Sequence, residues 1–149
     1  MRTFYQDIFD LLPDLDEFMF APSRNQLGRV ADFLIDLQQC QCFYCGKSLK
    51  NTKYAVDHFI PWSLYPVDTG HNFVLADEKC NSQKSNYLAS NEFFHKWQER
   101  NEAQNLIIVD AISILGFLTD KERSHNVAEW AYSQAKENNY ILWNLSNKI

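Results

Sequence analysis

Residues 42–84 constrain the fold of this 149-residue chain more than any other segment. The segment contains, in order, four short polar elements: the Cys42-x-x-Cys45 pair, an Asp57-His58 pair after an apolar stretch, Asn72 before a second apolar stretch, and Cys80-Asn81-x-x-Lys84. Each element is common on its own. Their order predicts a small metal-binding unit of two strands and a helix.

Two short strands are expected first. Tyr54 to Phe59 and Asn72 to Ala76 are rich in β-branched and aromatic residues, which predicts a hairpin closed by a long loop. Neighbouring side chains on a regular strand point to opposite faces, so Asp57 and His58 can serve one site only if the strand is already unravelling there. Pro61 is expected to supply this break.

A helix from Glu78 to about Leu88 should follow the second strand. On it, Asn81 and Lys84 are three residues apart and share a face, whereas Cys80 is rotated by about 100° from Asn81. One helix can therefore serve two sites. Its Cys80 side can meet Cys42 and Cys45, the two cysteines of the segment that we call the knuckle. Its Asn81 side can meet the acid–histidine pair of the first strand.

Helical periodicity predicts that helices flank this core. The expected helices are Thr3–Leu12, ended by Pro13, then Asn25–Gln39, Ser90–Gln104, a mostly buried Leu106–Phe117, and a last helix from the capping box Thr119-x-x-Glu122 to about Asn138. The predicted fold is α+β. We expect one domain over residues 1–149, with a helical part at 1–39, the core at 40–98 and C-terminal helices at 99–149.

Composition and charge narrow the class of protein. A hydrophobic fraction of 46% predicts an ordered chain, and no apolar run approaches the roughly 20 residues of a membrane span, so we expect a cytoplasmic protein. The net charge of -5 argues against tight nucleic-acid binding by bulk electrostatics. Residues 21–100 are the least acidic part, with nine basic and eight acidic residues. A partner protein or a homo-oligomer is therefore expected to supply more positive surface.

The cysteines favour metal binding over disulfides. Cys40, Cys42 and Cys45 lie within six positions, a spacing suited to thiolate ligation in a reducing compartment. Zinc is the expected ion, since it prefers sulfur and nitrogen ligands in structural sites.

The combined motif resembles the HNH endonucleases, the ββα-metal nuclease superfamily, and is most similar to a subgroup with DHFIPWS after the first strand and CN-x-x-K on the helix. The resemblance covers residues 40–98. It implies that His58 is the general base, that Asp57 and Asn81 bind a catalytic divalent cation, and that Asn72 pins the long loop. Lys84 is similar in position to residues that contact phosphate, although a lone lysine is more often a solvated charge.

The same resemblance raises a question about the zinc site. Zinc-bearing members carry a second Cys-x-x-Cys, but the position three before Cys80 is Asp77. An aspartate oxygen is an acceptable zinc ligand, so Cys42, Cys45, Asp77 and Cys80 form a reasonable set. Cys40 or His71 remains an alternative fourth ligand, as does a knuckle held by packing without zinc.

The function implied is hydrolysis of phosphodiester bonds in DNA, expected to be double-stranded, with catalytic Mg²⁺ or Mn²⁺ and structural Zn²⁺. Compact nucleases of this kind resemble effectors of bacterial restriction or phage-defence systems. The alternative is a zinc-knuckle subunit that binds nucleic acid or protein without cutting. The acidic residues 1–20 and the aromatic C-terminal part favour docking to a partner.

Overall fold

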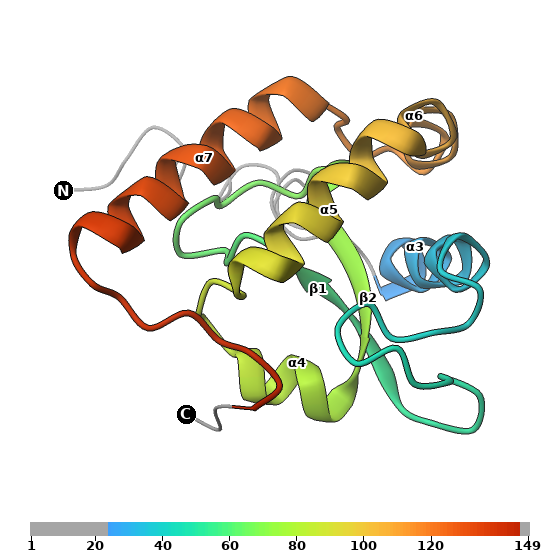
Figure 1. Ribbon diagram of the computed structural model, residues 1–149. Helices are drawn as coiled ribbons and strands as arrows, with labels where there is room; N and C mark the ends of the chain where they lie inside the picture. The colour runs from blue at the N-terminus through green and yellow to red at the C-terminus, as the bar shows by residue number, and fades with distance from the viewer. Residues whose placement is uncertain (1–23, 147–149) are drawn as a thin grey trace, which may run out of the picture.

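An antiparallel hairpin forms the centre of the computed structural model, which describes residues 24–146 (Figure 1). Strand β1 (Tyr54–His58) pairs with β2 (Phe73–Asp77) in a register that sets Tyr54 opposite Asp77 and His58 opposite Phe73. The predicted hairpin and the α+β fold are confirmed. The second strand starts one residue later than expected, because Asn72 ends a 3-10 turn, η1 (Gly70–Asn72).

Five helices surround the hairpin in the described part of the chain. They are α3 (Arg24–Leu37), α4 (Glu78–Lys84), α5 (Asn91–Ala103), α6 (Asn105–Ile114) and α7 (Lys121–Glu137). Helices α3 and α4 both contact β1 and β2, and α5 runs in front of the hairpin in the view of Figure 1. None of these helices is long and apolar enough to cross a bilayer. The predicted helix Thr3–Leu12 lies outside the described residues.

The hydrophobic core is built on the hairpin and α5. Residues 73–76 of β2 are buried on both faces, because helices cover the strand on each side. Phe59, directly after β1, stacks on Trp97 of α5 with ring centroids 5.0 Å apart. This packing joins the end of β1 to a helix, and it fixes the strand end that carries His58.

Helix α5 also anchors the start of β2 through polar contacts. The buried Arg100 guanidinium donates hydrogen bonds to the backbone oxygens of His71 and Phe73 at 2.8 and 2.7 Å. Trp97 donates its indole N–H to the same His71 oxygen at 2.8 Å. Burial lowers the pKa of Arg100 to about 10, which still leaves the side chain charged at neutral pH.

Helix α6 differs from its prediction. The segment was expected to be mostly buried, but Leu106, Ile107 and Ile114 are 77%, 54% and 85% exposed. Only Ile108 and Ile112 enter the core. The helix packs mainly against α5 and η1, so one narrow stripe is covered and much of its apolar surface remains open.

The start of α7 also differs in detail. The cap is Asp120, not Thr119, and its side chain accepts a hydrogen bond from the Arg123 backbone N–H at 3.0 Å. Asp and Thr are both good N-cap residues, so the sequence alone could not separate two adjacent candidates.

Candidate active site and metal cluster

Three cysteines and one aspartate gather where the knuckle meets the start of α4. The ligand atoms of Cys42, Cys45, Asp77 and Cys80 all lie within 4.8 Å of one another. Bonds of roughly 2.0 to 2.3 Å put the ligand atoms of a tetrahedral zinc site about 3.3 to 3.8 Å apart, so these four atoms need only small shifts to hold one ion. The predicted clustering of these four side chains is confirmed. The donor set fits zinc.

Asp77 has two tasks in this arrangement. Its Oδ1 accepts a hydrogen bond from the Cys80 backbone N–H at 2.7 Å, which caps α4. Its Oδ2 lies 3.0 Å from the Cys45 sulfur, on the side of the cluster. One carboxylate can thus start the helix and still offer an oxygen to a metal ion.

The two alternative fourth ligands lie outside the cluster. Cys40 is not among the four clustered residues. The fully buried His71 is hydrogen-bonded through Nε2 to Asn105 at 2.8 Å. Burial lowers the pKa of His71, and this favours a neutral ring in the core.

Burial sets the protonation of the cluster. It raises the pKa of the Cys80 thiol, with a further contribution from Cys42 and Cys45, and it also raises the pKa of Cys45. Burial acts in the same upward direction on Asp77, but hydrogen bonds from Cys45 and the Cys80 amide outweigh it and hold the pKa of Asp77 below its ordinary value. A metal ion would bind after displacing thiol protons.

Asp57 lies on β1 in a buried polar network. Its Oδ2 accepts a hydrogen bond from the Tyr44 hydroxyl at 2.6 Å and lies 3.3 Å from the Lys84 ammonium. Burial raises the pKa of Tyr44 well above its ordinary value, and the Asp57 charge adds to the effect, so the phenol remains a donor. Because Tyr44 stands between Cys42 and Cys45, the knuckle touches the strand carboxylate directly.

Lys84 is not the solvated charge that the alternative interpretation predicted. Its side chain is fully buried, and Nζ donates to the His58 backbone oxygen at 3.1 Å. Burial lowers the pKa of Lys84, while the Asp57 charge opposes this shift. The lysine therefore does not lie in solvent. It ties α4 to the last two residues of β1.

His58 is the last residue of β1, and its pairing with Phe73 is regular. The expected unravelling at Asp57 and His58 is therefore wrong, because the strand leaves the sheet only after His58. The imidazole Nε2 lies 2.7 Å from Asp68 Oδ1. Asp68 was missed in the sequence, since it sits ten residues away in a loop and belongs to no recognisable spacing.

Asn72 clamps the loop between the strands. Its Oδ1 accepts from the Ile60 N–H at 2.8 Å, and its Nδ2 donates to the Ile60 carbonyl at 2.9 Å. The Phe59 N–H also donates to the Asn72 carbonyl at 2.8 Å. This geometry matches the loop-pinning role expected for Asn72.

Asn81 occupies the half-exposed face of α4, three residues before Lys84. Within residues 24–146 the structure gives its side chain no hydrogen-bond partner. Residues three apart on a helix are neighbours on one face, so Asn81 lies near the Lys84–Asp57 contact. Its amide oxygen is available to a ligand.

Comparison with known proteins agrees with this geometry. Residues 42–90 match the family model for HNH endonucleases. This segment is therefore similar to an HNH endonuclease domain. It contains both strands, η1, α4 and all the residues of the two clusters described above.

The chain also resembles parts of much longer proteins. Over 92 residues the chain is 27% identical to the CRISPR-associated endonuclease Cas9 of Corynebacterium diphtheriae. The matched region is 61% of this chain and 8% of that protein. A solved type II-C Cas9 from Actinomyces naeslundii is similar at a TM-score of 0.41 and 21% identity, over 76% of this chain and 14% of that one. The chain thus spans a small fraction of either relative.

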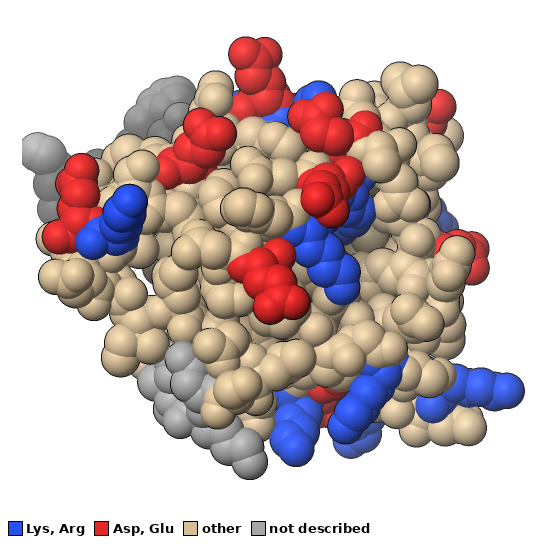
Figure 2. All heavy atoms as spheres, viewed as in Figure 1, with Lys and Arg blue, Asp and Glu red and all other residues tan. Residues whose placement is uncertain are grey.

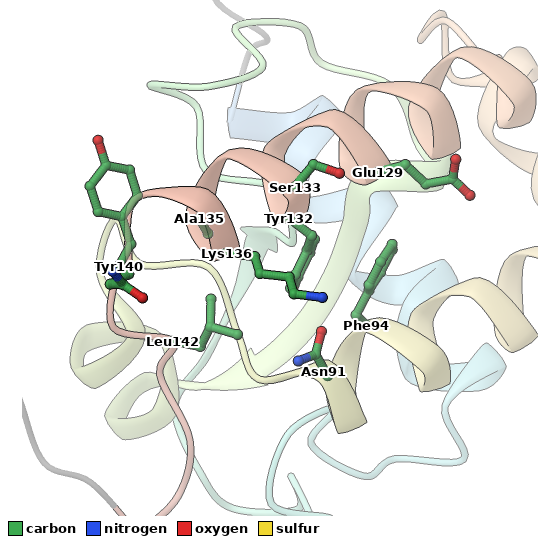
Figure 3. Close-up of a pocket in the computed structure, with 10 residues that line it drawn as sticks. Asn91, Phe94, Glu129, Tyr132, Ser133, Ala135, Lys136, Tyr140 and Leu142 are labelled. Atoms are coloured by element: carbon green, nitrogen blue, oxygen red, sulfur yellow. The ribbon is translucent and has the colours of Figure 1, made fainter.

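A pocket of about 790 Å³ lies away from the HNH residues (Figure 3). It is bordered by α5, α7 and the segment after α7. Phe94 and Tyr132 stack at its base with ring centroids 4.0 Å apart, and Tyr140 stands at its rim. Asp57, His58 and Asn81 do not line it, so this pocket is separate from the candidate active site.

Proposed function

We propose that this chain is a divalent-metal-dependent endonuclease that hydrolyses phosphodiester bonds in double-stranded DNA. The observation that carries the proposal is the docking of α4 on the end of β1 within the HNH segment, where Lys84 contacts the Asp57 carboxylate and the His58 backbone oxygen. The test is cleavage of plasmid DNA by the purified protein with Mg²⁺, Mn²⁺ or EDTA, alongside a zinc assay. Activity that persists in EDTA would overturn the proposal.

In this proposal His58 removes a proton from water, because an imidazole is the side chain best suited to that step near neutral pH. Because the strand stays regular through His58, Asp57 leaves its opposite face, towards Tyr44 and Lys84. We therefore propose that the scissile phosphate binds beyond the last residue of β1, where both faces are open to it, and not over one face of the sheet. The two hydrogen bonds between Asn72 and Ile60 hold the loop after β1 against the start of β2. Lys84 and Tyr44 hold the Asp57 carboxylate in one orientation.

Asp57 and Asn81 fit a catalytic cation. Two donors engage Asp57 Oδ2, whereas Oδ1 has no recorded partner, and the Asn81 amide is also free in the described part of the chain. Carboxylate and amide oxygens are ligands that Mg²⁺ and Mn²⁺ accept, and two protein ligands leave positions for water and substrate. When bound, the ion would stabilise charge on the leaving oxygen.

Asn81→Ala should raise the Mg²⁺ concentration needed for half-maximal cleavage by about tenfold or more, since one of two protein ligands is lost. The variant removes no side-chain hydrogen bond within residues 24–146, so it should melt like the wild type. Asp57→Ala is a poorer probe, because it also leaves the buried Lys84 ammonium unpaired.

Asn86→Ala is the matched control for this titration, because Asn86 is an exposed residue just after α4. Its Mg²⁺ requirement should equal that of the wild type. If Asn81→Ala gives the same titration as Asn86→Ala, Asn81 does not bind the cation.

Exposed lysines support DNA as the substrate. Blue side chains gather along the lower edge of Figure 2, in the region of α4 and the segment that precedes β1 in Figure 1. Lys47, Lys50, Lys53 and Lys79 are exposed in these segments, and none forms an ion pair within the described residues. The Glu78 N–H donates to the Lys53 carbonyl at 3.0 Å, which brings the two segments together. We propose that this edge contacts the phosphate backbone.

Replacing Lys50 and Lys53 by Gln should weaken DNA binding in EDTA and reduce its dependence on salt. The slope of log K against log salt should fall by about one for each lost phosphate contact. Lys136→Gln, on the exposed surface of α7, is the control and should leave the slope unchanged. Equal slopes in all three proteins would show that DNA binds elsewhere.

We further propose a cytoplasmic role as the nuclease effector of a bacterial restriction or phage-defence system. Thiols in the cluster suit a reducing compartment. The defence role rests on family resemblance alone. Phage plating on cells that express the chain or its His58→Ala variant tests it, and equal plating on both would refute it.

A second candidate is an interaction subunit that does not cut on its own. The open apolar face of α6, with Leu106, Ile107 and Ile114, favours a partner protein or a homo-oligomer. Light scattering distinguishes a monomer from an oligomer. Intact metal sites with no cleavage of any nucleic acid would favour this candidate.

A further inference from the structure

His58 is held by a carboxylate that the nuclease motif does not include. Its Nε2 lies 2.7 Å from Asp68 Oδ1, and the two side chains are only 27% and 18% exposed. The imidazole ring also packs edge-on against Trp62 and Phe73, at centroid distances of 5.4 and 5.6 Å. The ring is therefore fixed by one polar contact and two aromatic contacts.

The chain around Asp68 is itself anchored. The next residue, Thr69, donates its hydroxyl to the Leu118 carbonyl at 3.1 Å, and the Gly70 N–H donates to the same oxygen at 2.8 Å. A Cβ on Gly70 would lie 2.7 Å from Ile112 Cγ2, so the backbone is pressed against α6. Asp68 is thus next to an anchored part of the loop. Its backbone is held in place, whereas a residue in an ordinary surface ion pair is free to move.

The contact decides which ring nitrogen carries the proton. An ionised carboxylate only accepts hydrogen bonds, so Nε2 must be the donor. In the neutral ring Nδ1 then keeps its lone pair and can accept a proton. A general base needs one nitrogen free in this way and the other held in place.

We propose that Asp68 is a positioning residue that fixes His58 as the Nε2–H tautomer and directs Nδ1 towards the attacking water. This inference rests on the proposed nuclease function. In the step, the water proton passes to Nδ1 and the water oxygen forms the new bond to phosphorus. The bond from phosphorus to the leaving oxygen breaks, and the leaving oxygen takes its electron pair. Asp68 faces the imidazolium that results.

Asp68→Ala and Asp68→Asn test the proposal in the full chain. Both should lower kcat by on the order of 10- to 100-fold, the usual effect of losing an orienting partner. The KM for DNA and the Mg²⁺ requirement should stay at the wild-type values, because neither variant touches Asp57 or Asn81. Asp110→Asn, which removes an exposed carboxylate on α6, is the control for charge and should keep full activity.

Nitrogen-15 NMR of the imidazole, at a pH where the ring is neutral, gives a readout that does not need turnover. Wild-type His58 should show the Nε2–H tautomer, and Asp68→Ala should show a mixture of both. Wild-type kcat in both variants, or an unchanged tautomer in Asp68→Ala, would overturn the proposal. Should Asp68→Ala fail to fold, the near-isosteric Asp68→Asn still tests kcat. If the wild type does not cut DNA, the proposed function fails, while the tautomer still reports on the Asp68 contact.

Discussion

His58→Ala should lower DNA cleavage by a factor on the order of 10² to 10⁴, the usual range for loss of a general base. The reason is local, since no other described imidazole lies at the strand end. His71 is buried on Asn105, and His125 lies 3.2 Å from Asn101. Zinc content and melting temperature should stay near the wild-type values, because His58 contributes no atom to the cysteine cluster. Plasmid cleavage rates, zinc content and thermal melts measure all three.

His95→Ala is the matched control, since His95 is exposed on α5 and remote in sequence from the strand end. It should cut like the wild type. A His58→Ala protein that also cuts at the wild-type rate would remove His58 from the mechanism. Loss of activity together with loss of zinc would point to a folding defect instead.

Cys45→Ser should strip zinc and lower the melting temperature by about 10 °C or more. Structural zinc contributes folding free energy directly, with apparent values of roughly 10 to 16 kcal/mol in zinc-finger peptides. A loss of even about 4 kcal/mol would produce such a shift in a chain of this size. Cleavage should fall with it, because Tyr44 of the knuckle would no longer hold Asp57. Metal analysis and thermal melts provide the measurement.

Asp77→Asn separates the zinc role of Asp77 from its capping role. Asparagine is also a good N-cap, so the start of α4 should survive, whereas a charged ligand is lost. We expect weaker retention of zinc against a chelator, and normal retention in Cys40→Ser. The opposite ranking would assign the fourth ligand to Cys40.

Much of the HNH core could be predicted because its signals are local. The β-branched and aromatic strands, the pair of cysteines three apart and the cysteine at the helix start depend on neighbouring residues, and the structure brings Cys42, Cys45, Asp77 and Cys80 together as expected. The bounds of α3, α5 and α7 also fall within a few residues of their predictions.

The features that the sequence did not predict, namely the burial of Lys84, the Asp68 contact and the exposure of α6, share a different cause. Whether Lys84 is buried depends on Asp57, 27 positions earlier, and the Asp68 contact depends on how a loop folds back to His58. The exposure of α6 depends on which neighbours cover it, which periodicity does not encode. Each is a property of long-range packing between residues with no fixed spacing.

The double hydrogen bond between Asn72 and Ile60 has a consequence for how such a nuclease can diversify. It closes the loop at its base. Because doubling the length of a flexible loop costs only about 0.6 kcal/mol in closure entropy, insertions at the exposed Ser63–Leu64 turn should be tolerated if Trp62 and Asp68 keep their contacts with His58. New DNA-contacting segments could thus be added at this point while the cutting machinery stays as it is.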